Sequence, residues 1–290
     1  MNDFLNAIGF SNVKTRKQID NILEDAINNY DLSYQHKEGD ILKEERIRYY
    51  GLDYGIRVCG ELDEEGEYRI ENFFPFVAPE VISGEFNVDV IPRNDSVAYL
   101  GVCEDKRNGA TILFRFVEGM DKNFGVPRYS ERYNNARVCF TGLSNAGMII
   151  MPIAKSVMDN SIATVKKFKR NNLMEKAMAG NQEAIESLTL EDIDLISSLQ
   201  SRIQTEDVLS IVNTTFLPFG FENDQYLVIG EITECNSTRN KMTGDEVFVI
   251  SVVANETPMT IAVNRNDLVG EPAVGRRFKG VVWLQGFLDI

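Results

Sequence analysis

The sequence predicts an α+β protein with three parts: an N-terminal domain built on an antiparallel sheet with flanking helices, a helical connector, and a small OB-like β-barrel at the C-terminal end. Three observations predict this fold. Residues 41–153 hold eight strand-like runs, residues 154–225 return to helical periodicity, and residues 226–290 alternate strands with tight turns. Helical segments precede and follow the eight runs instead of separating them, which is typical of α+β folds. The expected domains are therefore 1–153, 154–225 and 226–290.

The first 30 residues are expected to be helical, with a short turn over DFLNAI and a longer helix over TRKQIDNILEDAINNY. Gly9 follows the short turn, where a helix C-cap is expected. The longer segment carries one apolar stripe at helical spacing. Its members are Ile19, Ile22, Leu23, Ala26 and Ile27. We expect the stripe to pack into the core, and a partner surface is the alternative.

Residues 41–153 predict an antiparallel sheet, because short turns rich in Asn, Asp and Gly join neighbouring runs. The runs are RIRYYG, GIRVCGEL, EYRIENFFPFV, FNVDVIP, VAYLGVCED, ATILFRFVEG, RVCFTGLS and MIIMPIA. Hairpins are expected at DEEG, DKRNG and SNAG. The last of these lies within GLSNAG, residues 142–147. This segment lacks the GxSxG spacing of a nucleophile elbow and lies between two strand-like runs, which also favours a hairpin. The acidic stretch ELDEEGE, residues 61–67, is expected to be a charged hairpin tip, with a cation site as the alternative.

Residues 154–225 are expected to form a helical connector. A long helical stretch ends at Gly180, and further helices start at the capping residues Asn181, Thr189 and Thr205. The basic run KKFKR, residues 166–170, is expected to be a solvated helical face, with contact to an acidic partner as the alternative. FLPFGFENDQ is expected to be the linker into the barrel.

Residues 226–290 predict a barrel from the strands YLVIGEITEC, VFVISVVA, PMTIAV and RRFKGVVWLQGFLDI. If the last strand is regular, Phe278, Gly280, Val282 and Leu284 point to the barrel interior. The candidate ligand or partner site comprises Phe248, Arg265, Arg276, Lys279 and Trp283. Trp283 beside Lys279 on an outer face is typical of a stacking platform or a protein interface. The alternative is that Trp283 covers the barrel against the helical connector.

Composition excludes several kinds of chemistry. The net charge is −14, and all three parts are acidic, with 17 basic and 25 acidic residues in 1–153, 7 and 11 in 154–225, and 6 and 8 in 226–290. A protein that grips nucleic acid needs clustered cations, so the charge argues against that partner. His36 is the only histidine, placed in a loop-like segment, which leaves little room for histidine-based catalysis.

We expect no metal, cofactor or catalytic residue. The four cysteines, Cys59, Cys103, Cys139 and Cys235, are far apart and predict buried, reduced thiols. CxxC, HxxxH, GxxxxGK[ST] and GxGxxG spacings are lacking. Neither a secretory signal nor an apolar run of about 18 residues is present, so we expect a cytoplasmic protein without a membrane span.

Three segments together resemble a known bacterial family. They are LTLEDIDLISSLQSRIQTEDVLSIVNTTFLPFGFENDQYLVIGEI, FTGLSNAGMIIMPIAKS and the opening FLNAIGFS. The family is catalogued as domain of unknown function 3881, and the resemblance covers essentially the whole chain. It implies a bacterial, cytoplasmic protein and brings no substrate, cofactor or catalytic residue with it.

These observations favour a non-enzymatic binding or scaffold protein that uses its barrel or sheet to engage a protein partner or a small ligand. Two alternatives stay open. One is single-stranded nucleic-acid binding through the aromatic and basic residues of the barrel. The other is a carboxylate-dependent hydrolase, since paired acids can meet in space without any signal in their spacing.

Overall fold

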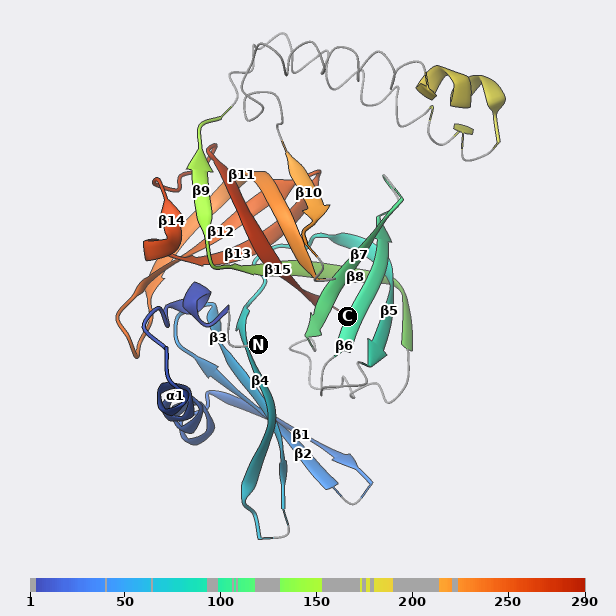
Figure 1. The fold of residues 1–290 in the computed structure, drawn as a ribbon. Helices are drawn as coiled ribbons and strands as arrows, with labels where there is room; N and C mark the ends of the chain where they lie inside the picture. Colours follow the sequence, from blue (N-terminus) through green and yellow to red (C-terminus); the bar gives the residue numbers. More distant parts are fainter. Residues whose placement is uncertain are drawn as a thin grey trace. The chain divides into compact units, whose positions relative to one another are not determined.

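The computed structural model shows a fold that is mostly β (Figure 1). It describes residues 4–39, 41–63, 65–92, 99–105, 107, 109–117, 131–152, 173, 176–177, 180–189, 214–220 and 224–289. The chain divides into two compact units, one of Met1–Met151 with Thr214–Ile290 and one of Pro152–Asn213. In the first unit the described α-helix is α1, Arg16–Asn28. The predicted α+β class is therefore corrected to a mostly β fold, because long strand pairs dominate the first unit.

The N-terminal helical segments form where the sequence predicts them. A 3-10 turn, η2, spans Asn6–Ile8, and Gly9 ends it with a φ of 91°. Only glycine adopts this left-handed conformation without strain. Helix α1 begins with a capping box in which Thr15 accepts from the Gln18 backbone N–H while the Gln18 side chain accepts from Thr15. Its buried residues belong to the predicted stripe, and they are Ile22, Leu23 and Ala26.

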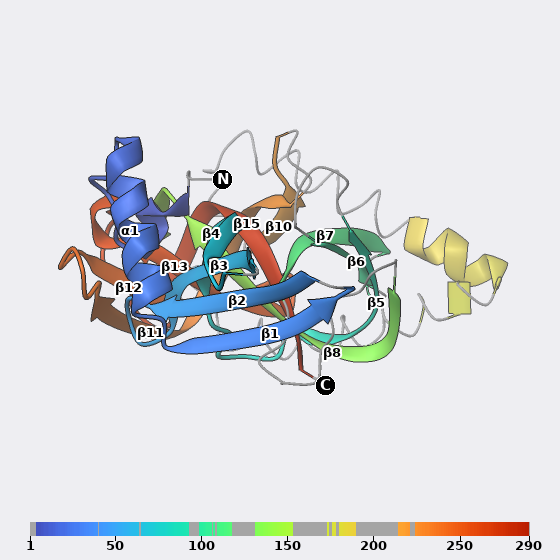
Figure 2. The ribbon, with the colours of Figure 1, turned by 90° about the horizontal axis from the view of Figure 1, so that it is seen from below.

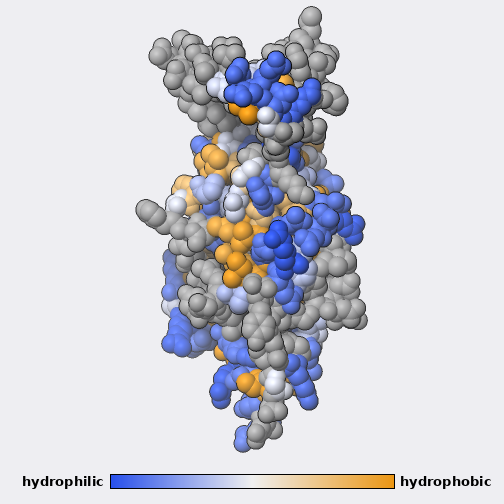
Figure 3. Space-filling model, turned by 90° about the vertical axis from the view of Figure 1, so that its right-hand side faces the viewer, coloured by the Kyte–Doolittle hydropathy of each residue, from blue (hydrophilic) through white to orange (hydrophobic). Residues whose placement is uncertain are grey.

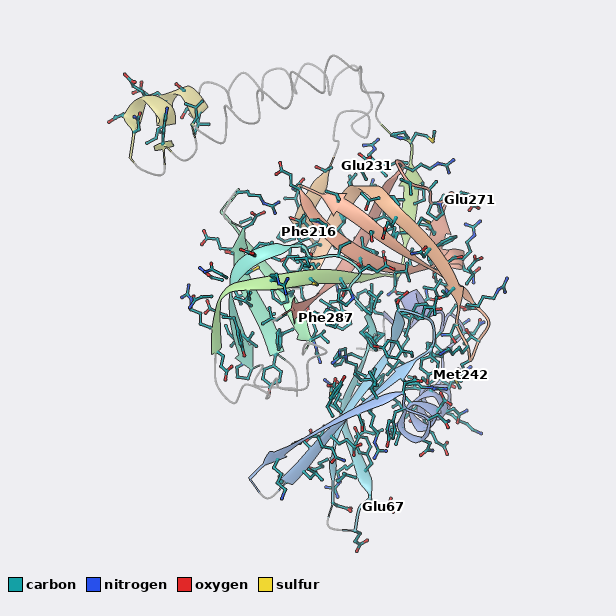
Figure 4. All side chains as sticks on the ribbon, turned by 180° about the vertical axis from the view of Figure 1, so that it is seen from behind. Glu67, Phe216, Glu231, Met242, Glu271 and Phe287 are labelled. Atoms are coloured by element: carbon teal, nitrogen blue, oxygen red, sulfur yellow. The ribbon has the colours of Figure 1, made fainter. Side chains whose placement is uncertain are left out.

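Four strands form an antiparallel sheet in the order β1-β2-β3-β4. The strands are β1 (Leu32–Glu38), β2 (Ile41–Tyr49), β3 (Tyr54–Leu62) and β4 (Tyr68–Val77). The predicted DEEG hairpin joins β3 to β4, and Glu67 lies at its tip, far from the barrel (Figure 4). The loop expected around His36 is wrong, since this segment is β1. Its sequence, LSYQHKE, lacks apolar alternation because β1 is an edge strand.

Eight further strands close into a barrel in the order β11-β12-β13-β8-β5-β6-β7-β15, and β15 pairs with β11 to complete the ring. Their bounds are β5 Gly84–Pro92, β6 Tyr99–Asp105, β7 Ala110–Val117, β8 Glu131–Ser144, β11 Gln225–Arg239, β12 Glu246–Ala254, β13 Thr257–Asn264 and β15 Arg277–Asp289. The predicted DKRNG hairpin joins β6 to β7. Most pairs are antiparallel, as predicted, but β8 with β13 and β7 with β15 are parallel.

The long strands β8 and β15 also pair with each other, from Arg137↔Asp289 to Gly142↔Leu284. This ribbon divides the eight-strand ring into two five-strand rings. One contains β11, β12 and β13, and the other contains β5, β6 and β7. The strands of residues 226–290 lie where the sequence predicts them, and β8, from the segment 1–153, supplies the strand between β13 and β15.

The predicted hairpin at GLSNAG is wrong. β8 is followed by β9, Gly147–Ile150, and both strands run antiparallel to β15, one after the other. The register changes by one residue between Gly142↔Leu284 and Gly147↔Gly280, so the segment bends within one line of strands. Small and Asn residues suit such an irregularity as well as they suit a turn, so the sequence signal is ambiguous.

Two apolar cores lie on the two sides of the barrel wall. The barrel interior is one cluster that spans both five-strand rings, and Phe278, Val282 and Leu284 belong to it as predicted. The second cluster lies between the outer side of the barrel, the four-stranded sheet and α1. Figure 2, seen from below, shows β1 and β2 in front with α1 beside them.

The contact between barrel and four-stranded sheet combines aromatic and polar groups. Phe287 of β15 lies between the two (Figure 4), and the guanidinium of Arg57 lies over the rings of Phe76 and Phe287. The Gln285 side chain donates to the backbone oxygen of Pro75 at 2.8 Å. The sheet is therefore fixed to the barrel by packing and by a direct hydrogen bond.

Most of the predicted helical connector lies outside the described residues, including the runs that begin at Thr189 and Thr205 and the basic run KKFKR. Residues 182–189 are helical, and Asn181 caps them by accepting from the backbone N–H of Ala184. Part of the expected linker is a strand, because β10, Thr215–Pro218, pairs with β11. A helix with the length and apolar character to cross a membrane is not found among the described residues.

Candidate functional site

Trp283 of β15 points outward from the barrel, as the strand alternation predicts, but its ring is only 7% exposed. It stacks on Phe4 with ring centroids 5.2 Å apart. Its Nε1–H donates to Asp224 Oδ2 at 2.9 Å. The aromatic face that would stack on a base or a partner is therefore covered by the N-terminal segment.

The other predicted site residues divide into separate groups. Arg265 lies in the 3-10 turn η3, Arg265–Asp267, with its guanidinium 5.7 Å from the ring centre of Phe248. Arg265 forms an ion pair with Glu271, and Arg276 donates to the Glu271 backbone oxygen at 2.6 Å. Lys279 lies on β15 between Ile229 and Met148. The structure thus brings Phe248, Arg265 and Arg276 together around the Glu271 loop, shown in Figure 4, and leaves Trp283 in the second core.

A groove of about 1030 Å³ lies elsewhere, between the N-terminal segment and β4. One wall is the chain from Leu5 through the first half of α1, and the other is β4 from Ile70 to Phe73. Its apolar lining residues are Leu5, Phe10, Val13, Ile19, Leu23, Ile70 and Phe73. The other eight lining residues are polar or charged, so the lining is mixed, and a volume near 1000 Å³ lies at the upper end of the range for ligand sites.

The N-terminal wall is held rigidly by its hydrogen bonds to the barrel. The Asn240 side chain donates to the backbone oxygen of Ile8 at 2.8 Å, and Thr243 donates to that of Gly9 at 2.6 Å. The Asn6 amide donates to Asp267 at 2.8 Å. Because these contacts tie residues 6–9 to the β11–β12 turn and η3, the wall is preorganised, which lowers the entropy cost of binding.

The β4 wall is the edge of the four-stranded sheet. Among the described strands, β3 is the only neighbour of β4. Four consecutive residues of β4, Ile70–Phe73, line the groove. A β-bulge at Glu71 interrupts the regular alternation of side chains, so neighbouring residues of this stretch can face the same side. Further along, the Pro75 carbonyl is already bound by Gln285.

The two ends of the groove differ in charge. Lys14 and Arg16 are exposed and form no ion pair with another described residue, whereas Glu71 on the opposite wall pairs with Lys43. Asp20 lies one helical turn beyond Arg16 on the same wall. Glu71 is also the extra residue of a β-bulge, because the register passes from Cys59↔Asn72 to Gly60↔Ile70. The start of α1 is therefore a locally cationic end in a chain whose net charge is −14.

The model of one protein family matches this chain over residues 5–286, nearly its whole length. Its description reads "Domain of unknown function, E. rectale Gene description (DUF3881)". The chain belongs to this family. Neither the curated proteins nor the solved structures contain a match. The DUF3881 membership predicted from three segments is confirmed, and it brings no activity with it.

In this DUF3881 chain, two described carboxyl groups have raised pKa values. Burial raises the pKa of Glu80, although a hydrogen bond from Ser251 opposes the shift. Burial also raises the pKa of Asp267, opposed by the hydrogen bond from Asn6. Neither carboxyl lines the groove. A set of three or more His, Cys, Asp or Glu side chains placed to hold a metal ion is lacking among the described residues.

Sequence reasoning about the DUF3881 chain missed the groove. The apolar stripe of α1 was expected in the core, and Ile22 and Ala26 are buried there, but Ile19 and Leu23 also line the groove. Ile70 of β4 is 37% exposed, and nothing in its sequence neighbourhood predicts a binding site. On the face drawn in Figure 3, apolar side chains also gather near the middle beside hydrophilic ones. Single exposed apolar residues are common, so only their convergence in three dimensions identifies a site.

Proposed function

We propose that this protein is a non-enzymatic binding protein that engages a protein partner through the groove between its N-terminal segment and β4. The observation that carries the proposal is the groove itself, with its volume of about 1030 Å³ and seven apolar lining residues. Its cationic end favours a partner segment that carries a carboxylate. The sequence predicted an interaction surface on either the barrel or the sheet, and we propose that it lies on the four-stranded sheet.

We also propose that the barrel is OB-like in character and serves as the support of this site. Its ring of β11, β12, β13, β8 and β15 has five strands, the number in an OB-fold. The covered ring of Trp283 favours support over base stacking. The cytoplasm stays the proposed location.

A site-specific crosslink tests the binding role. A photoreactive benzoylphenylalanine replaces Ile70 in the groove or, as a matched control, Leu52, which is 75% exposed outside it. Crosslinked proteins from the native host are identified by mass spectrometry, purified and titrated against the protein. We expect Val13→Asp to weaken binding of the true partner at least tenfold and Val274→Asp, at a site 67% exposed outside the groove, to leave it unchanged. Equal effects of the two variants would rule out the groove as the binding site.

A further inference from the structure

Helix α1 presents a second face to the groove, besides the one that it buries in the core. The residues of α1 that line the groove are Arg16, Ile19, Asp20 and Leu23. Their spacing is i, i+3, i+4 and i+7, which places them on one continuous face of a helix. The apolar pair in this face is one turn apart and is flanked by one cation and one carboxylate. An apolar seam with charges beside it is the surface that one helix offers to another.

The four-stranded sheet adds side chains to the same groove. Arg46 of β2 donates to the backbone oxygen of Ile27 at 3.2 Å, so its side chain lies on the face of the sheet that α1 covers. Arg46 is the cross-strand partner of Val58, which is in turn that of Phe73. Cross-strand partners point to the same face, and the bulge in β4 brings Ile70 to that face as well. The groove is therefore a continuation of the α1 side of the sheet over β4.

This arrangement defines the form of an occupant. The apolar lining residues come from three elements: α1, the segment that precedes it and β4. A chain laid among them buries backbone N–H and C=O groups that need partners. A helix supplies these partners within itself and takes none from the walls, and its apolar stripe is broad enough to contact three elements at once. This reasoning rests on the groove being a binding site, as proposed above.

We propose that the occupant is an amphipathic helix of a partner protein, packed beside α1 over Ile70 and Phe73. Its apolar stripe contacts the half-buried side chains of Val13, Ile19 and Phe73. Two packed helices have their axes about 8–10 Å apart. The face of α1 that lines the groove is about 11 Å long, at 1.5 Å per residue, so a partner helix of about three turns covers it.

The charges of the groove define the polar residues of the partner helix. Lys14 and Arg16 are exposed and form no ion pair with another described residue, so they face an Asp or Glu of the partner. Asp20 is exposed one turn beyond Arg16 and is likewise without an ion pair to a described residue, so it faces a Lys or Arg. Glu71 is held by Lys43 and does not compete. The recognised pattern is an apolar helical stripe with one acidic and one basic residue beside it.

Selection of random sixteen-residue peptides displayed on phage against the full-length chain tests this proposal. We expect enriched peptides to carry apolar residues at i, i+3, i+4 and i+7 with an acidic residue beside them. Val13→Asp, and separately Lys14→Glu with Arg16→Glu, should weaken their binding at least tenfold. The matched controls lie at exposed positions outside the groove and should change affinity by less than twofold. They are Val274→Asp and, with the same change of net charge as the double variant, Lys17→Glu with Lys37→Glu.

Two changes to an enriched peptide then test the helix itself. A hydrocarbon staple between solvent-facing positions one turn apart should tighten binding at least threefold, because it forms the helix in advance. Proline at a central solvent-facing position should weaken binding at least tenfold, because it breaks the helix, whereas alanine there should have less than a twofold effect.

The other outcomes separate the helix from the binding role. Peptides that depend on the groove variants but tolerate proline and lose affinity on stapling would overturn the helix and leave the binding role standing. Peptides indifferent to the groove variants, or none enriched, would overturn both. A dimer of the free chain that Val13→Asp dissociates would identify a second copy as the occupant and overturn the proposed partner.

Discussion

Tyr226 lies on β11 with its ring in the barrel interior and its hydroxyl oxygen accepting from the backbone N–H of Leu113 at 2.8 Å. Burial raises the pKa of Tyr226 to about 12, although the hydrogen bond from Leu113 acts in the opposite direction. An unfolded tyrosine ionises near pH 10, so between these values the unfolded chain loses a proton that the folded chain keeps. The stabilisation is complete below pH 10 and is lost as the pH rises toward 12.

We therefore expect the free energy of unfolding to fall between pH 10 and 12, with Tyr226 contributing on the order of 2 kcal/mol. Urea titrations at intervals from pH 8 to 11.5 measure this slope. Tyr226→Phe removes the titrating group and should make the slope shallower above pH 10. Tyr30→Phe, at a side chain 43% exposed, is the control and should leave the slope as in the wild type. Identical slopes for all three proteins would contradict the assignment.

Arg57 shows how a single buried charge ties the sheet to the barrel. It is 1% exposed, and its Nη1 lies 3.1 Å from Glu45 Oε1. Its Nε and Nη2 have no hydrogen-bond partner in the part of the chain that the structure describes, and the guanidinium lies against the rings of Phe76 and Phe287. Removing one partner of a buried ion pair is costly because the other charge stays in a low-dielectric site. Truncating Arg57 would therefore leave the Glu45 carboxylate without this ion pair, and we expect it to weaken the contact.

At the scale of elements, Phe114 of β7 fills space that two glycines leave on neighbouring strands. Gly101 of β6 is its direct cross-strand partner, and a Cβ there would lie 2.2 Å from the ring. A Cβ on Gly286 of β15 would lie 2.3 Å from the same ring. An aromatic ring packed over a strand glycine compensates for the missing side chain.

We expect Gly101→Ala to lower the free energy of unfolding by about 1–3 kcal/mol, because the ring of Phe114 must move within a filled core. Urea unfolding of the single variants and of Gly101→Ala combined with Phe114→Leu gives a double-mutant cycle. The smaller side chain should relieve the clash, so the double variant should be more stable than the sum of the two single effects predicts. Additive effects would show that the steric contact does not decide the cost.

The sequence predicted strand positions well and strand partners poorly. The apolar alternation of GIRVCGEL and VFVISVVA is local, and β3 and β12 lie there. The pairing of β8 with both β13 and β15 joins distant segments, and no local pattern encodes it. The SNAG hairpin was wrong because Asn and Gly suit a strand irregularity as well as a turn. No local pattern encodes the groove, because its two walls are separated by about fifty residues of sequence. Trp283, the only tryptophan, is visible in the sequence by itself.

At the scale of the whole molecule, the free edges are unevenly distributed. Closing eight strands into a ring removes the edges of those strands. Among the described strands, the outer strands of the four-stranded sheet are β1 and β4. The polar sequence of β1, with Lys37 among its exposed residues, protects that edge from pairing. β4 lies instead beside the groove, whose lining combines apolar and polar residues.

Barrel closure also predicts how the chain behaves when it is cut. The pairs β8 with β13, β8 with β15 and β7 with β15 all join residues before 153 to residues after 213. A fragment of residues 226–290 keeps β11, β12, β13 and β15 but lacks β8, so β13 and part of β15 become open edges with exposed apolar residues. We expect this fragment, and the fragment 1–152, to show no cooperative unfolding transition when each is made alone.

Reassembly of two fragments tests the same point. When fragments 1–152 and 214–290 are mixed in urea and the urea is then removed, they should associate with one-to-one stoichiometry. The complex should recover a cooperative transition, as followed by circular dichroism and sedimentation. A mixture in which Phe140→Asp disrupts the interior side of β8 is the control and should not associate. A cooperative transition in the isolated fragment 226–290 would instead show that the C-terminal segment folds as the independent domain that its sequence predicts.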